Sequence, residues 1–284
     1  MPLDPSDQHR RAVQFRDLHA AAEPFVIPNP WDAGTARILT GLGFAALATT
    51  SAGLAFALGR QDGANLVSRA ETLANAAAVA EATHLPVSAD LENGFATDPG
   101  QIGETIRLAA DAGLVGGSIE DATGRPDSPV FPFDLAVERV VAAVEAAKAL
   151  PFPFILTARA ENFLYGIPDL DDTIRRLQAY EAAGADVLYA PGLPDLAAVR
   201  AVCTAVDRPV NVLAGGTCPT WTAAELAACG VRRISIGSAL PRAALATVLA
   251  AATEIKERGS FGFAGDALPY QQVNAMMADP GELS

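Results

Sequence analysis

The chain alternates between short apolar runs and longer alanine-rich segments, and the alternation is repeated eight times. The apolar runs are residues 25–27, 45–48, 86–89, 116–119, 154–157, 187–190, 209–213 and 233–236. The segments long enough for helices are roughly residues 32–41, 68–83, 100–112, 134–149, 170–183, 195–206, 222–229 and 241–258. Strands that alternate with helices predict a parallel sheet, and strands that are apolar throughout are typical of a sheet covered on both faces. We therefore predict an α/β fold, a (β/α)8 barrel of the TIM type.

The length of the chain fits one such barrel. No serine- or glycine-rich linker interrupts the pattern, and 284 residues accommodate a barrel of about 250 residues with terminal extensions. We predict a single domain over residues 1–284 with a C-terminal helical extension from about residue 259. The extension contains a helical stretch near residues 268–277, which would pack either on a neighbouring subunit or on its own barrel.

The charge and the cysteine content exclude several classes of partner. The chain carries 33 acidic and 20 basic residues, a net charge of −13, so it repels phosphate backbones and no nucleic acid partner is expected. No apolar stretch reaches about 18 residues, so no membrane span is predicted. The N-terminal residues lack an apolar signal core and the three cysteines form no CxxC pair, which predicts a cytoplasmic protein.

Acidic side chains follow two neighbouring strands at the point where each strand ends. Asp90 and Glu92 follow the third run, two residues apart, so that an extended chain points them the same way, and Glu120 follows the fourth. Oxygen ligands without nearby His or Cys suit Mg²⁺ or Mn²⁺, and Mg²⁺ keeps several waters, so one direct carboxylate would suffice. Asp62, in the long segment after the second run, is a further candidate for the outer set. Separate salt bridges are the alternative interpretation.

Arg159 follows the fifth run and is the candidate clamp for an anionic substrate. Its alternative role is an ion pair with Glu161 or Glu120. Arg242, after the eighth run, is a second candidate that falls near a helix start. The histidines lie away from the strand ends, and no Ser-His-Asp set, dinucleotide-binding glycine motif or well-placed lysine is present. The residues therefore favour metal-assisted chemistry on a 2-oxo acid.

Longer motifs occur in order over almost the whole chain. They are NPWDAGTARIL (29–39), TTSAGLAFALGRQDG (49–63), SADLENGF (88–95), GGSIED (116–121), TARAENF (157–163), GADVLYAPG (184–192) and GVRRISIGSALPRAA (230–244). Together they resemble the isocitrate lyase/phosphoenolpyruvate mutase superfamily. The resemblance implies a barrel whose eighth helix is exchanged between subunits, and it predicts a homo-oligomer, a dimer or a dimer of dimers.

The resemblance also implies a role for each candidate residue. Asp90 would bind Mg²⁺, and Asp62, Glu92 and Glu120 would act mostly through waters. The remaining substrate-binding candidates are Trp31, Thr50, Ser51, Ala52, Asn211 and Arg242. Among these, the segment 49–52 would bind the substrate carboxylate through backbone amides and the Ser51 hydroxyl. Arg159 would hold the anionic end of the substrate, and Arg159, Asp62 and Glu120 are the catalytic candidates.

The chain departs from the family in the segment after the fourth run. Family lyases carry a Lys-Lys/Arg-Cys-Gly loop there whose cysteine is the catalytic acid, but residues 121–131 contain neither Cys nor Lys. Family lyases also place a glutamate after the sixth strand, where this chain has Pro191. These departures argue against isocitrate lyase, methylisocitrate lyase and phosphonate mutase activity. Decarboxylation of oxaloacetate needs no acid side chain, because CO₂ leaves without taking a proton.

We therefore predict an Mg²⁺-dependent lyase or decarboxylase that acts on a small 2-oxo or 2-hydroxy acid such as oxaloacetate. One alternative is another reaction at the same metal, either hydrolysis of oxaloacetate or cleavage of phosphonopyruvate. A second alternative is a non-catalytic protein that binds 2-oxo acids. Tyr165, Tyr189 and Thr217 are the candidates for any proton donor.

Overall fold

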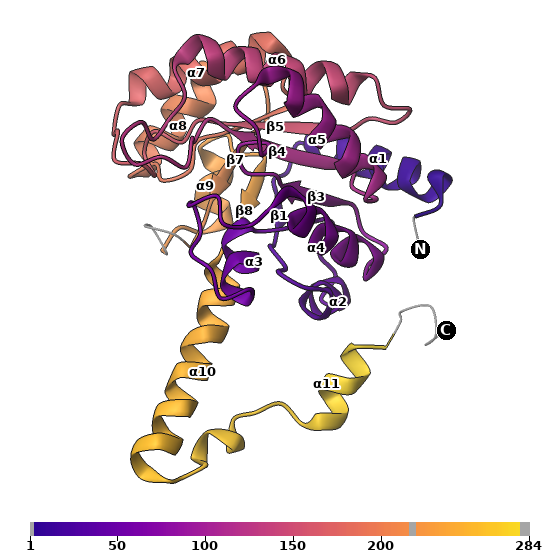
Figure 1. Ribbon diagram of the computed structural model, residues 1–284, viewed down its shortest axis with the longest axis vertical. Coiled ribbons are helices and arrows are strands. Elements are labelled where there is room, and N and C mark those ends of the chain that lie inside the picture. The colour runs from indigo at the N-terminus through magenta and orange to yellow at the C-terminus, as the bar shows by residue number, and fades with distance from the viewer. Residues whose placement is uncertain (1–2, 216–219, 279–284) are drawn as a thin grey trace.

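The computed structural model describes residues 3–215 and 220–278 and contains a barrel of eight parallel strands (Figure 1). The strands are β1 (Phe25–Ile27), β2 (Leu47–Ala48), β3 (Val87–Asp90), β4 (Gly116–Glu120), β5 (Ile155–Arg159), β6 (Val187–Tyr189), β7 (Val210–Leu213) and β8 (Arg233–Ser235). They pair in the order β1-β8-β7-β6-β5-β4-β3-β2. Each predicted run overlaps one strand, and the (β/α)8 fold is confirmed.

Helices cover the outside of the barrel, and the last ones in the chain extend away from it (Figure 1). They are α1 (Pro5–Ala20), α2 (Ala33–Gly41), α3 (Ser51–Ala57), α4 (Arg69–Glu81), α5 (Pro99–Asp111), α6 (Phe133–Lys148), α7 (Leu170–Ala183), α8 (Leu196–Ala205), α9 (Ala223–Ala228), α10 (Ala239–Arg258) and α11 (Tyr270–Met276), with a 3-10 turn η1 (Gly262–Gly265). Helices α1 and α3 are not predicted by the sequence pattern. Short local signals start both helices, since Asp4 caps α1 and the Thr50 hydroxyl accepts the Gly53 amide of α3.

Asn29 connects β1 and β2, the first and last strands in the order of strand pairing. The Ala48 amide donates to the Pro28 carbonyl at 3.1 Å, just past the end of β1. The Asn29 side chain donates to the Thr49 carbonyl at 3.1 Å and accepts the amides of Ile236 and Gly237 at 2.9 and 2.8 Å. One buried amide side chain thus links the carboxyl ends of β1, β2 and β8, which completes the ring around the site.

Helix α1 covers the amino-terminal end of the barrel. Ala12 and Phe15 pack with Ile27, Val115 and Ile155 in a separate apolar cluster. A Cβ atom at Gly116 would lie 2.8 Å from the Phe15 ring, so only glycine admits this side chain at the start of β4. The main core lies between the barrel and its surrounding helices. The polar opening of the barrel is therefore at the opposite end, where the strands finish.

The C-terminal segment leaves the barrel. Figure 1 shows α10 leading away from the strands, and its side chains Leu245, Val248 and Leu249 are exposed. Helix α11, which falls within the predicted stretch 268–277, returns so that Met277 lies against Gly34 of α2. Among the described residues, no helix is both long enough and apolar enough to cross a bilayer.

Candidate active site

One cavity of about 160 Å³ lies at the carboxyl ends of the strands. Six predicted site residues line it, namely Thr50, Ser51, Ala52, Asp62, Asp90 and Arg159. A larger cavity of about 680 Å³ lies at the amino-terminal side, lined by residues such as Arg16, His19 and Arg232. We place the candidate site in the smaller cavity because the carboxylates gather there, at the face where barrels of this kind carry their active sites.

Arg159, the last residue of β5, is held by three carboxylates. Its Nε lies 2.8 Å from Oε1 of Glu161, its Nη1 3.0 Å from Oδ1 of Asp90 and its Nη2 3.0 Å from Oε2 of Glu120. The guanidinium carbon also lies 5.1 Å from the centroid of the Tyr189 ring. A guanidinium has five N–H donors, so these ion pairs fix its position and still leave donors for a ligand. The ion pairs considered as its alternative role are both present.

The site carries more negative than positive charge. Burial raises the pKa of Glu120 and of Glu161 above the usual glutamate range, although Arg159 opposes the shift. Burial and the neighbouring Asp90 carboxylate raise the pKa of Glu92 to about 8. Asp62 belongs to an exposed segment, but desolvation where it faces the cavity, together with Asp90, raises its pKa as well. Burial lowers the pKa of Arg159, but Glu161, Glu120 and Asp90 outweigh this effect and raise it. The cluster therefore attracts protons or another cation.

Glu92 reaches this cluster through an unusual backbone conformation. Strand β3 ends at Asp90, and Glu92 has a φ of 48°, in the left-handed region that non-glycine residues rarely adopt. The prediction was that an extended chain points Asp90 and Glu92 the same way. The chain is not extended at Glu92, so this reason is wrong. The turn brings the two carboxylates together instead, and the Glu120 amide holds it by donating to the Glu92 carbonyl at 3.0 Å. Strain of this kind concentrates at functional sites.

Helix α3 places Ser51 at the edge of the cavity. The Ser51 amide donates to Oδ2 of Asp90 at 3.1 Å, and its hydroxyl forms a hydrogen bond with Asp62 that partly opposes the rise in the pKa of that carboxyl. Ser51 thus connects the long segment after β2 to the end of β3. The helix packs very closely: a Cβ atom at Gly53 would lie 2.7 Å from Cγ2 of Thr50 and 2.8 Å from Cβ of Trp31. Glycine at position 53 is therefore required for this placement.

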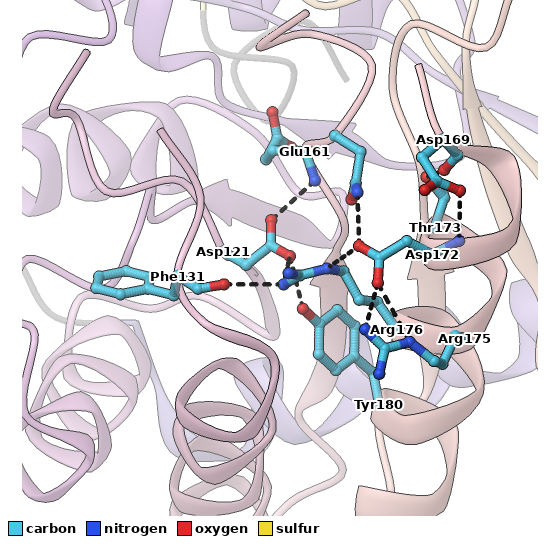
Figure 2. A network of polar contacts seen from close by, with 10 residues as sticks. Asp121, Phe131, Glu161, Asp169, Asp172, Thr173, Arg175, Arg176 and Tyr180 are labelled. Carbon is cyan, nitrogen blue, oxygen red and sulfur yellow. Dashed lines mark hydrogen bonds and ion pairs between the residues drawn. The ribbon is translucent and has the colours of Figure 1, made fainter. Parts of the chain in front are cut away.

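A second polar network, centred on Asp121, is connected through Glu161 to the ion pairs of Arg159 (Figure 2). Buried Asp121 accepts the Glu161 amide at 2.8 Å through Oδ1. Its Oδ2 accepts Nη1 of Arg176 at 3.0 Å and the Tyr180 hydroxyl at 2.7 Å. Glu161 in turn holds Nε of Arg159. Helix α7 is thereby connected through Asp121 and Glu161 to the guanidinium at the cavity.

The same network holds the segment after β4. Arg176 donates to the Phe131 carbonyl at 3.0 Å, and the Phe131 amide donates to the Asp121 carbonyl at 2.7 Å. Ala122 and Val130 form an antiparallel bridge between these points. In the family resemblance this segment is the loop that carries the acid. Here it is a hydrogen-bonded hairpin with both ends fixed, as Figure 2 shows at Phe131.

Three predicted substrate-binding residues lie away from the cavity lining. Trp31 packs against α3 at Gly53. Asn211 is buried within β7, where it donates to the Ser235 hydroxyl at 3.0 Å and accepts Nε of Arg233 at 2.9 Å. Arg242 lies in the first turn of α10, on a solvent-exposed surface, and points toward the carbonyls of Ser238 and Gly215.

The candidates for a proton donor differ in their placement. Tyr189 lines the cavity, and burial raises its pKa to about 12. Burial also raises the pKa of Tyr165. Both phenols keep their protons at neutral pH. Thr217 lies outside the described residues.

Several residues that shape the site are not predicted from the sequence. Glu161 was considered only as a partner for Arg159, yet it joins the two networks. Asn29 and Arg233 line the cavity from β1 and β8. Their positions carry no local signal other than a polar residue in or next to an apolar run, at Arg233 inside the eighth run and at Asn29 two residues after the first. That signal indicates an inward-facing polar side chain in a barrel interior.

The described carboxylates do not form a direct metal cage. Within the described residues, no three Asp, Glu, His or Cys side chains are spaced to hold one ion directly. Mg²⁺ usually keeps several waters and needs one or two direct carboxylates. The oxygen-only donor set and the raised pKa values of Glu92 and Glu120 fit a hydrated divalent ion and do not fit a dry cage.

The fold and the site together define a (β/α)8 barrel with an arginine-centred carboxylate site. The chain belongs to the phosphoenolpyruvate phosphomutase family, which it matches over residues 15–256. A putative lyase/mutase from Burkholderia cenocepacia has the same fold with a TM-score of 0.93 and 56% identity, covering 97% of this chain and 98% of that one. An uncharacterized protein of Mycobacterium tuberculosis is 31% identical over 94% of this chain and 97% of its own length. Oxaloacetate decarboxylase of Ectopseudomonas mendocina is 28% identical over 86% of this chain and 83% of its own. The resemblance read from the motifs is confirmed.

Proposed function

We propose that this protein is a divalent-metal-assisted lyase that decarboxylates a small 2-oxo acid such as oxaloacetate. The observation that carries the proposal is the meeting of Asp90 and Arg159 at one cavity of about 160 Å³, a volume suited to a small organic acid. The relationship to an oxaloacetate decarboxylase supports it.

Mg²⁺, with Mn²⁺ as a substitute, is the ion that the donor set suits. Asp90 would hold it directly, while Asp62, Glu92 and Glu120 would hold its waters. When bound, the ion would polarise the 2-oxo group of the substrate and stabilise the negative charge that develops there. It would also offset the excess of carboxylates that raises the pKa of Glu92 to about 8.

The protein's own residues would position the substrate, and the segment after β4 provides no acid side chain of the family type. Arg159 forms ion pairs with Asp90 and Glu120 and lines the cavity, where N–H groups that these ion pairs do not use would bind a substrate carboxylate. Thr50, Ser51 and Ala52 line the same wall at the start of α3. The hairpin 121–131 contains no Cys or Lys, so it supplies no acid of the kind that family lyases use. Loss of CO₂ requires none, and solvent can protonate the product enolate.

The assay is pyruvate formation from oxaloacetate in the presence of Mg²⁺. Free Mg²⁺ decarboxylates oxaloacetate by itself, so Asp90→Ala protein at the same concentration is the baseline. Asp111→Ala, which removes an exposed carboxylate at the end of α5, is the matched control. We expect wild type and Asp111→Ala to exceed the baseline by at least about 100-fold, the range for loss of one key electrostatic group.

Other outcomes of the same assay would indicate one of the two alternative functions. Oxalate and acetate in place of pyruvate would indicate hydrolysis at the same metal. Saturable binding of oxaloacetate without any product, across several divalent metals, would indicate a binding protein and would refute the proposed reaction.

We further propose that the protein is a homo-oligomer in which α10 packs on a partner subunit. Apolar side chains of α10 that do not contact their own barrel support this, since Leu249 is 69% exposed and Val248 63% exposed. Light scattering would give a monomer mass if the proposal fails. The reduced cysteines Cys203 and Cys229 suit the proposed cytoplasmic location.

A further inference from the structure

A buried arginine lies at the inner end of the same cavity, and neither its contacts nor its charge is explained by the site described above. Arg233 is the first residue of β8, 5% exposed, and lines the cavity together with Asp90 and Arg159. It lies at the amino-terminal end of its strand, beside Asn211 of β7 in the ladder. The cavity therefore reaches from the carboxylates at the strand ends down to this guanidinium.

The partners of Arg233 carry no compensating charge. Its Nε donates to Oδ1 of Asn211 at 2.9 Å, and its Nη1 lies 3.4 Å from Nε2 of His19. Burial and the nearby Arg233 charge lower the pKa of His19 to about 3, so this imidazole is neutral. Nδ1 of His19 lies 2.8 Å from the Phe15 carbonyl and donates to it, which leaves Nε2 as the acceptor for Arg233. Among the described residues, no carboxylate forms an ion pair with Arg233.

Two other buried arginines, Arg11 and Arg139, also form no ion pair with a carboxylate among the described residues, but both donate to backbone carbonyls. Arg139 donates to the backbone carbonyls of Asn93, Ala96 and Thr97 and lies over the Phe131 ring. Its Nη1 and Nη2 donate to the protein itself, whereas its buried Nε has no partner among the described residues. The two contacts of Arg233 use two of its five N–H groups. A buried cation whose donors face a cavity is costly unless an anion enters that cavity.

The space above Arg233 suits such an anion. Barrel interiors are usually filled with bulky branched side chains. Here Ser88, Ser118 and Ser235 line the cavity between the two arginines. These side chains are small and polar, so they leave room for a ligand. Ser88 and Ser118 offer hydroxyl groups to a carboxylate, whereas the Ser235 hydroxyl already bonds Asn211 and Tyr189.

We propose that Arg233 forms an anion subsite at the floor of the cavity and binds the second carboxylate of a dicarboxylic acid whose 2-oxo acid end lies near Asp90. Asn211 and His19 are positioning residues, because they contact the guanidinium of Arg233 and are not among the residues that line the cavity. The subsite makes the protein selective for dianions over monoanions of the same class. This inference rests on the proposed function for the identity of the 2-oxo acid end, but dianion binding can be measured without turnover.

The test compares oxaloacetate with pyruvate, which has the same 2-oxo acid end but lacks the second carboxylate. In Arg233→Gln protein we expect the KM for oxaloacetate to rise by about 10- to 100-fold, the effect of losing a charged hydrogen bond. The inhibition constant of pyruvate should stay within about twofold of wild type, because pyruvate does not reach the floor. A purely structural role for Arg233 would weaken both ligands equally.

Arg232→Gln is the matched control. Arg232 is the preceding residue, points out of the barrel and donates to the Ala22 carbonyl at 2.7 Å, so both constants should be unchanged. Equal weakening of both ligands in Arg233→Gln, or no change in either, overturns the inference. If Arg233→Gln does not fold, Arg233→Lys is the second variant, because it keeps the positive charge on a shorter side chain. We expect the KM for oxaloacetate to rise several-fold in Arg233→Lys while the inhibition constant of pyruvate is unchanged. Equal changes in both constants would again overturn the inference.

Failure of the proposed function is recognised separately. If the wild type turns over no oxaloacetate, calorimetric binding of malonate and of pyruvate in Mg²⁺ buffer replaces the kinetic constants. Tighter malonate binding that is lost in Arg233→Gln supports the subsite even then. Malonate binding that is the same in wild type and Arg233→Gln refutes it.

Discussion

Glu120 and Arg159 face each other as register partners on β4 and β5, and the same two side chains form an ion pair of 3.0 Å. The backbone ladder therefore sets the distance between these two charges. Because Arg159 also holds Asp90 and Glu161, one guanidinium coordinates carboxylates from three segments of the chain.

Removal of this guanidinium should destabilise the protein strongly. Arg159→Met leaves buried carboxylates without their cation, and we expect the free energy of unfolding in urea to fall by about 3–5 kcal/mol. Adding Glu120→Gln to that variant should restore part of the loss, because it removes one unpaired charge. Arg10→Gln, which breaks an exposed ion pair with Asp7, should cost less than about 1 kcal/mol. A double variant no more stable than Arg159→Met would contradict the proposed coupling.

Gly53→Ala should disturb the wall of the cavity. The new Cβ would lie 2.7 Å from Thr50 and 2.8 Å from Trp31, so α3 must shift, and we expect a loss of about 1–3 kcal/mol of stability with reduced turnover. Gly41→Ala is the control, because no atom lies within 4 Å of its added Cβ and it lies in helix α2, where alanine is favoured. Wild-type turnover in Gly53→Ala would show that the placement of α3 is unimportant.

The network behind the site should affect both stability and rate. Tyr180→Phe removes the 2.7 Å hydrogen bond to Asp121, and we expect a loss of about 1–2 kcal/mol together with a several-fold lower kcat, since Asp121 positions Glu161 and through it Arg159. Tyr270→Phe, on an 83% exposed side chain of α11, should change neither quantity. A stability loss with unchanged kcat would separate the network from the chemistry.

His19 should make the protein sensitive to acid. Its pKa is about 3 in the folded state against about 6.5 in the unfolded chain, so the unfolded state binds more protons between these values and stability falls as the pH is lowered through this window. The contribution approaches about 1.4 kcal/mol per pH unit.

The comparison variant is His19→Gln, which should lose less stability than wild type between pH 7 and pH 5, by up to about 2 kcal/mol. His84→Gln, at an exposed position after α4, should follow the wild-type curve. Parallel curves for wild type and His19→Gln would show that His19 already titrates normally in the folded protein.

The barrel could be predicted because its signals are local and repeated. Each apolar run predicts a strand and each alanine-rich segment predicts a helix, without reference to the rest of the chain. Because the strands of the barrel are parallel, the strands that end in Asp90, Glu120 and Arg159 must end at the same face. The boundaries differed mainly at the strand ends, where β4 and β5 include the charged residues that had been placed just past them.

The partners of each charged side chain could not be read from spacing. Glu92 joins the cluster through a left-handed turn with a φ of 48°, although an extended chain was expected there. Asn211 was expected to contact the substrate, but the strand register places it against Arg233 and Ser235 inside the barrel. The first outcome depends on the backbone conformation of the turn after β3, and the second on how far β7 is shifted against β8.

The sequence by itself determined the order of the eight strands and of the helices that alternate with them, the family, and the set of acidic groups at the strand ends, because these follow from local pattern and from motifs. Only the tertiary structure decided that Arg159 is shared by three carboxylates and that Arg233 lies below them without one. The physical reason is that ion pairing and desolvation depend on distances between segments far apart in the chain, and those distances exist only once the barrel has closed.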